Sequence, residues 1–112
     1  MEVGNWFTVD FDDENVELRV KPPTRAAWEQ VFRWEEIERV CFKVEEYLVS
    51  DGIYIFTKGR QESYAIPIEA RGGLELWNEL ISRGLFDAEL AIQAATSTSG
   101  LFCWPPPSEE TV

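Results

Sequence analysis

The order of the elements along residues 32–85 constrains the fold more than any other feature of the chain. This stretch contains, in order and without a gap, two apolar runs, a glycine-marked hairpin, a short strand that ends at Ile66-Pro67 and an amphipathic helix. Strands that short turns connect pair antiparallel. The order therefore predicts a small antiparallel sheet closed by one helix, and it indicates architecture more than activity.

Alternation of apolar and polar residues marks the first strands. Residues 6–11 and 15–21 alternate with period two on either side of Asp12-Asp13-Glu14-Asn15, whose residue types favour a turn. After a break at Pro22-Pro23, residues 28–34 are interpreted as a further strand. The side chains expected on one side of that strand are Trp28, Gln30, Phe32 and Trp34.

The central strands follow. Residues 38–45 alternate in the same way, and their β-branched and aromatic content favours a strand over a helix across residues 35–47. Residues 53–57 and 63–66 predict a hairpin with Lys58-Gly59-Arg60-Gln61 at its tip.

A helix is expected from Gly72 or Gly73 to Arg83, with Gly84 as its C-terminal stop. A second, short helix follows, because Asp87 is a suitable N-cap for the apolar residues up to position 95.

The length of 112 residues fits one domain with its own core. We place that globular domain at residues 1–95. Residues 96–112 are a Ser/Thr/Pro-rich tail that carries an apolar patch. The patch residues are candidates for partner binding, because they are costly to leave in water: Leu101, Phe102 and Trp104. Packing of the patch on its own domain is favoured over docking on a partner.

Four features together resemble the bacterial pleckstrin-homology-like domains and cover about half of the chain. They are Trp34-x-x-Ile37, the strand at 39–45, the hairpin at 53–66 and the helix at 74–81. The resemblance implies an α+β fold: an antiparallel β-barrel or bent sheets of about six to seven strands, capped by a C-terminal helix. Such folds bind lipids, peptides or proteins, so the fold does not determine the function. Lipid-binding members hold phosphates with basic residues near the first strand–strand loop, and the acidic loop here argues against that use.

The formal net charge is −11, from 21 acidic and 10 basic residues. Such a chain repels nucleic acids and anionic membranes on average. Histidine is absent, which removes the commonest general base and the commonest ligand for zinc. The many glutamates are interpreted as a solvated acidic face rather than a catalytic pair. We therefore expect no enzyme, no cofactor and no bound metal.

Three short motifs have plain structural explanations. Asp10, Asp12 and Glu14 have a spacing that could ligate calcium, but Asn15 stands where the calcium loop needs glycine. A hairpin turn is favoured there. At Gly72-Gly73, a turn into the helix is favoured over a phosphate-binding loop. At Lys58-Gly59-Arg60, basic residues that keep a hairpin tip soluble are favoured over a site for an anionic ligand.

Cys41 and Cys103 stand 62 positions apart, and two cysteines form no disulfide framework, so we expect both to be reduced. The chain shows neither a signal-peptide pattern nor an apolar run of membrane-spanning length. The default expectation is a cytoplasmic protein.

Three hypotheses for function follow. The first is a non-enzymatic protein-binding or assembly module that acts on a protein partner or on itself, as a homo-oligomer. The second is an acidic inhibitor or immunity-type protein that caps a basic toxin or nuclease, with an affinity that falls as salt rises. The third is a small ligand-binding barrel with a pocket lined by tryptophan and glutamate.

Overall fold

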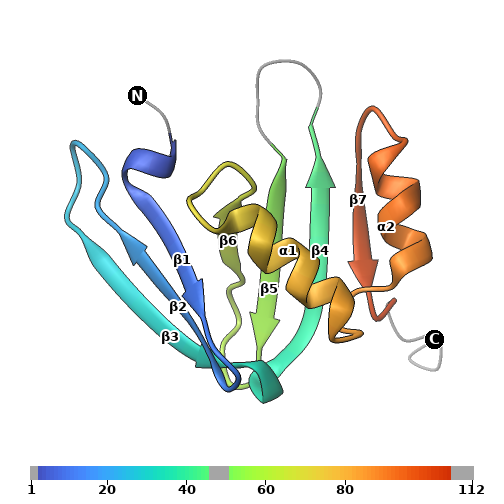
Figure 1. Cartoon of the computed structure of the whole chain (residues 1–112), viewed down its shortest axis with the longest axis horizontal. Helices are drawn as coiled ribbons and strands as arrows, with labels where there is room; N and C mark the ends of the chain where they lie inside the picture. The colour runs from blue at the N-terminus through green and yellow to red at the C-terminus, as the bar shows by residue number, and fades with distance from the viewer. Residues whose placement is uncertain (1–2, 46–50, 107–112) are drawn as a thin grey trace.

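The computed structural model describes residues 3–45 and 51–106 of the chain. They form an α+β fold with a three-stranded and a four-stranded antiparallel sheet and two α-helices (Figure 1). The predicted class is confirmed at this level. The part of the predicted helical alternative that falls on residues 46–47, and residues 107–112 of the predicted tail, lie outside the described residues.

The N-terminal sheet follows the predicted alternation closely. A short 3-10 turn, η1 (Val3–Asn5), leads into β1 (Phe7–Phe11), which pairs antiparallel with β2 (Asn15–Val20). β2 pairs on its other side with β3 (Trp28–Arg33). Alternate residues of β2 are buried, as a sheet with one wet face requires. The predicted hairpin and the third strand are confirmed.

The second sheet has the strand order β6-β5-β4-β7. A 3-10 turn, η2 (Trp34–Glu36), leads into β4 (Ile37–Val44). β5 (Gly52–Thr57) and β6 (Tyr64–Pro67) form the predicted hairpin beside it. β7 (Gly100–Trp104) pairs with the other side of β4. The segment interpreted as a tail therefore contributes a strand to the sheet.

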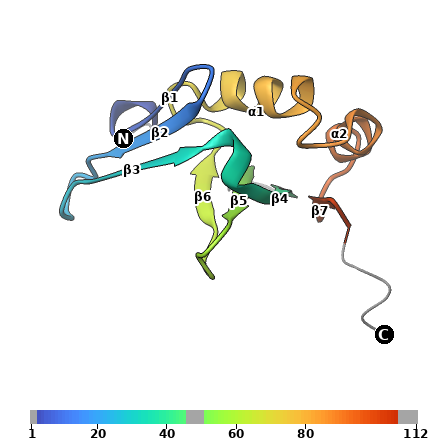
Figure 2. The ribbon, with the colours of Figure 1, turned by 90° about the horizontal axis from the view of Figure 1, so that it is seen from below.

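The helices are α1 (Gly73–Ser82) and α2 (Ala88–Ala95). Both match the expected segments, and the Asp87 carboxylate accepts the N–H of Leu90, as an N-cap does. Figure 2 shows both helices on the same side of the four-stranded sheet. The resemblance implies a C-terminal helix as the last element, whereas here α2 and β7 follow α1 along the chain.

The core lies between the two sheets and α1. Leu76 and Leu80 of α1 are fully buried. Trp77 stacks on Phe42 of β4 at 4.4 Å between ring centroids and contacts Phe86 at 4.7 Å. Burial of each such side chain contributes about 2 kcal/mol, so α1 is an integral part of the core.

Trp34, in η2 between β3 and β4, packs on the β1–β2 hairpin and on the residue that follows α1. Its Nε1–H donates to the carbonyl of Asp12 at 2.7 Å, and its ring lies edge-on to Phe11. The guanidinium of Arg83, after α1, lies over the same ring at 4.1 Å. The two sheets keep separate strand orders, and among the described residues they do not close into one barrel.

Candidate functional site

The predicted partner-binding residues all lie on β7, but on two faces of the sheet. Phe102 and Trp104 stand opposite Phe42 and Val40 of β4, and both pack against the core. Leu101 points to the outer face and is 62% exposed. The alternation of a strand thus separates the three residues. Only Leu101 is left mainly to solvent.

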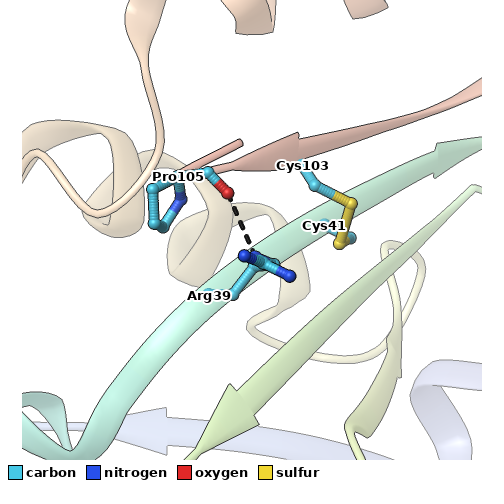
Figure 3. Close-up of a disulfide and its surroundings, with 4 residues drawn as sticks. All are labelled: Arg39, Cys41, Cys103 and Pro105. Carbon is cyan, nitrogen blue, oxygen red and sulfur yellow. Dashed lines mark hydrogen bonds between the residues drawn. A yellow bond between two sulfur atoms is a disulfide. The ribbon is translucent and has the colours of Figure 1, made fainter. Parts of the chain in front are cut away.

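β7 is attached to β4 by more than the backbone ladder (Figure 3). Cys41 and Cys103 stand opposite each other and form a disulfide. Beside it, Arg39 Nε donates to the carbonyl of Pro105 at 3.0 Å. The expectation that both cysteines are reduced is wrong, because the antiparallel register places the thiols together. Since disulfides persist in oxidising compartments, the bond does not support a cytoplasmic location, which stays a prediction.

The outer face of the four-stranded sheet carries a shallow apolar groove next to this disulfide. The open cleft has a volume of about 320 Å³. Its lining residues are Cys41, Lys43, Tyr54, Phe56 and Leu101. Both aromatic rings are half-buried, and they alternate along β5 with the buried Ile53 and Ile55. The groove has the chemistry to accept an apolar side chain.

The charge around the groove differs from that of the whole chain. Lys43 lines it, and its Nζ lies 3.2 Å from a carboxylate oxygen of Glu45. Arg39 is on the same face of β4, opposite Phe56 of β5. A ligand that carries a carboxylate next to an apolar group would find cations here, although the chain as a whole is strongly acidic.

The sequence analysis named Leu101 but missed Tyr54 and Phe56. The signal was available in principle, because two aromatic residues fall on the positions of β5 that alternate with isoleucine. A strand that is apolar on both faces does not reveal from sequence which face meets the core.

A second cleft, of about 430 Å³, opens at the N-terminal end of the three-stranded sheet. Trp6, Phe7 and Trp28 form its aromatic part, and Arg25 lies at its rim. Trp28 is 41% exposed and lies edge-on to Phe7. The residues that line this cleft include no carboxylate among those the structure describes, so it lacks the glutamate that the ligand-barrel hypothesis requires.

The acidic turn is a self-contained structure. Asp12 Oδ1 accepts the N–H groups of Glu14 at 2.9 Å and Asn15 at 2.8 Å. Asp10 pairs instead with Arg19 of β2. Two of the three carboxylates with calcium-like spacing, those of Asp10 and Asp12, are thus engaged in the hairpin. Among the described residues, no three potential metal-ligating side chains gather at one point.

The N–H groups of Glu14 and Asn15 lower the pKa of Asp12 below its ordinary value of 3.8. A lowered folded-state pKa means that the ionised carboxylate stabilises the fold above the unfolded-state pKa. This stabilisation is lost as the pH falls through the folded-state pKa.

For Asp12→Ala, we expect a loss of stability that shrinks as the pH is lowered from neutral through the folded-state pKa of the Asp12 carboxyl group. Urea unfolding along a pH series measures it. Asp13→Ala is the control, because it removes the same charge from the same turn. A stability gap between wild type and Asp12→Ala that is constant with pH would contradict the assignment.

The basic tip of the β5–β6 hairpin packs against its own sheet. The guanidinium of Arg60 lies over the ring of Tyr64 at 3.9 Å, and this ring stacks on Phe32 of β3. Gly59 takes the positive φ of 75° that the turn requires. The tip therefore packs against the end of the β6 strand rather than offering a free pair of cations.

None of the helices in the described part of the chain has the length and apolarity that crossing a membrane requires. Comparison of the chain with protein-family models, with curated proteins and with solved structures finds no significant match.

Proposed function

We propose that the protein is a non-enzymatic binding module that captures a protein partner on the outer face of its four-stranded sheet. The observation that carries the proposal is the exposure of Leu101 beside the half-buried rings of Tyr54 and Phe56. Single exposed apolar side chains are common on protein surfaces, but Leu101 adjoins two aromatic rings, and a contiguous apolar patch of this kind is typical of an interaction site.

The attachment of β7 supports the same role. Binding surfaces work best on rigid elements whose geometry is set before the partner arrives. Leu101 lies two residues from Cys103, and the disulfide fixes this part of β7 to the centre of the sheet. The groove is therefore preorganised for binding.

We assign the scaffold to the pleckstrin-homology-like class. Two antiparallel sheets with a helix packed across one face of the four-stranded sheet support this assignment. The acidic β1–β2 turn, in the place where lipid-binding members carry cations, favours a protein ligand over a phosphoinositide. An apolar segment flanked by a carboxylate fits the groove, because Lys43 and Arg39 lie on the same face.

Leu101→Asp is expected to weaken capture of the partner by about tenfold or more, because it removes the apolar contact and places a charge in the groove. Ile92→Asp on α2 is the matched control, since Ile92 is 64% exposed and lies away from the groove residues. Neither change should alter the free energy of unfolding by more than about 0.5 kcal/mol.

The partner is first identified with a photo-crosslinking amino acid at position 101 or 92 in the native source, and binding is then measured with purified components. Adducts from position 101 alone, together with the affinity loss for Leu101→Asp, support the proposal. Equal adducts from both positions, or equal affinities of the two variants, would rule out this surface.

A further inference from the structure

The outer edge of β3 is open. The strand order of the first sheet is β1-β2-β3, so β2 covers only one side of β3 (Figure 1). The opposite edge strand, β1, is partly covered: Val9 N–H donates to the carbonyl of Arg71, and Arg71 N–H donates to that of Phe7. Within the described residues, no strand pairs with the other side of β3.

The hydrogen-bond pattern identifies which backbone groups face this open edge. Trp34 N–H donates to the carbonyl of Glu14 at 3.1 Å, which extends the β2–β3 ladder by one step. In an antiparallel ladder, every second residue bonds to a given neighbour. The even-numbered residues of β3 therefore bond to β2, and Glu29, Val31 and Arg33 direct their N–H and C=O groups outward.

Arg33 marks where the free edge ends. Its N–H is occupied by the carboxylate of Glu36 at 2.8 Å, within η2. The outward groups of Glu29 and Val31, and the carbonyl of Arg33, remain available. An unpaired edge of this kind is a template for another strand.

The side chains of the same three residues are self-complementary. Glu29, Val31 and Arg33 lie on the wet face of β3, with Val31 in the middle and 56% exposed. The acidic Glu29 stands two positions before Val31, and the basic Arg33 stands two positions after it. An antiparallel copy of the strand, related by a two-fold axis at Val31, would place each Glu29 opposite an Arg33 and the two Val31 side chains together.

This register also fits the backbone. Directly opposed residues are then Val31 with itself and Glu29 with Arg33, and their outward N–H and C=O groups can all pair except the Arg33 N–H, which the Glu36 carboxylate already occupies. A shift of the register by two residues in either direction places Glu29 or Arg33 opposite Val31 and loses both charge pairs. Charge complementarity thus selects one register.

We propose that β3 pairs antiparallel with β3 of a second copy of this chain, centred on Val31, so that the two three-stranded sheets become one continuous sheet. This surface is separate from the groove at Leu101, so the inference does not depend on the proposed partner binding. The net charge of −11 on each copy opposes association at long range, and physiological salt screens that repulsion.

Sedimentation equilibrium over a wide range of protein concentrations tests the proposal. The wild type is expected to form a dimer. Glu29→Arg and Arg33→Glu should each raise the dissociation constant about tenfold or more, because each places like charges opposite one another at both symmetric positions. The double variant Glu29→Arg/Arg33→Glu should restore the wild-type value to within about threefold.

The two single variants control for net charge. Glu29→Arg makes the chain less acidic and Arg33→Glu makes it more acidic, so an effect of overall charge would strengthen one dimer and weaken the other. Specific pairing weakens both. Val31→Pro adds an independent readout, because its outward N–H bonds to no neighbour in the described fold, and edge strands tolerate proline at such positions.

A folded Val31→Pro monomer, seen together with the charge-swap rescue, supports the pairing. If the wild type is monomeric at all concentrations, or if its dimer survives both charge reversals, the proposal is overturned. The edge would then be left to a strand of another protein or to solvent.

Discussion

Reduction of the Cys41–Cys103 disulfide is expected to lower the free energy of unfolding by about 4 kcal/mol. The bond closes a loop across a sequence separation of 62. In the chain-entropy account, a cross-link of this span restricts the unfolded ensemble by roughly that amount. Chemical denaturation of the wild type with and without a thiol reductant measures the difference without any substitution.

The double variant Cys41→Ala/Cys103→Ala is the control for the reductant, whose addition should leave the stability of this variant unchanged. Hydrogen exchange then localises the effect. Since β7 is an edge strand held by β4, the disulfide and the Arg39–Pro105 hydrogen bond, its amides should lose protection first. A stability change under about 1 kcal/mol, or a loss of protection that begins in β1 or β2, would show that the disulfide does not secure this sheet.

Local periodicity explains why much of the fold could be predicted from the sequence. β1 and β2 have one buried and one wet face, so the alternation of Val16, Leu18 and Val20 with polar residues indicates both the strand and its orientation. α1 is similarly clear, because it carries an apolar stripe and is followed by Gly84 with a φ of 75°. In these elements, the pattern of residues that are close in the sequence is enough to predict the secondary structure and its buried face.

β7 could not be predicted in the same way. Its residues, Gly100–Trp104, show no alternation of polar and apolar types, and its partner β4 lies far away in the sequence. Only the packed structure determines that Phe102 faces Phe42 and that Cys103 faces Cys41. The disulfide was missed for this reason, since spacing along a chain does not indicate register across a sheet.

The candidate groove was predictable only in part. The cost of exposing Leu101 is evident from its residue type. Tyr54 and Phe56 join it because β5 is the neighbour of β4 on the side opposite β7, which is a fact of topology. Separate segments therefore build the surface, and none of them carries a recognisable motif.

Gly72→Ala is expected to destabilise the protein by about 3 kcal/mol. Gly72 has a φ of 85°, where a side chain costs about 1–2 kcal/mol. A Cβ at this position would also lie 2.2 Å from the carbonyl oxygen of Val9. Because that oxygen belongs to the backbone of β1, the overlap cannot be relieved by a side-chain rotation. Displacing α1 from β1 adds a further cost of about 1–3 kcal/mol.

Gly84→Ala separates the two contributions. Gly84 has a similar φ of 75°, but a Cβ there meets no atom within 4 Å. Its substitution should therefore cost only the conformational strain of about 1–2 kcal/mol. Urea unfolding of both variants gives the excess loss for Gly72→Ala, which measures the close approach of the α1 N-terminus to β1. Equal losses would mean that the segment from Arg71 to α1 can move away from β1 at little cost, although Val9 N–H donates to the carbonyl of Arg71 and Arg71 N–H donates to that of Phe7. In that case the helix would be anchored by its core side chains, Leu76, Trp77 and Leu80, and Gly72-Gly73 would serve only as a turn.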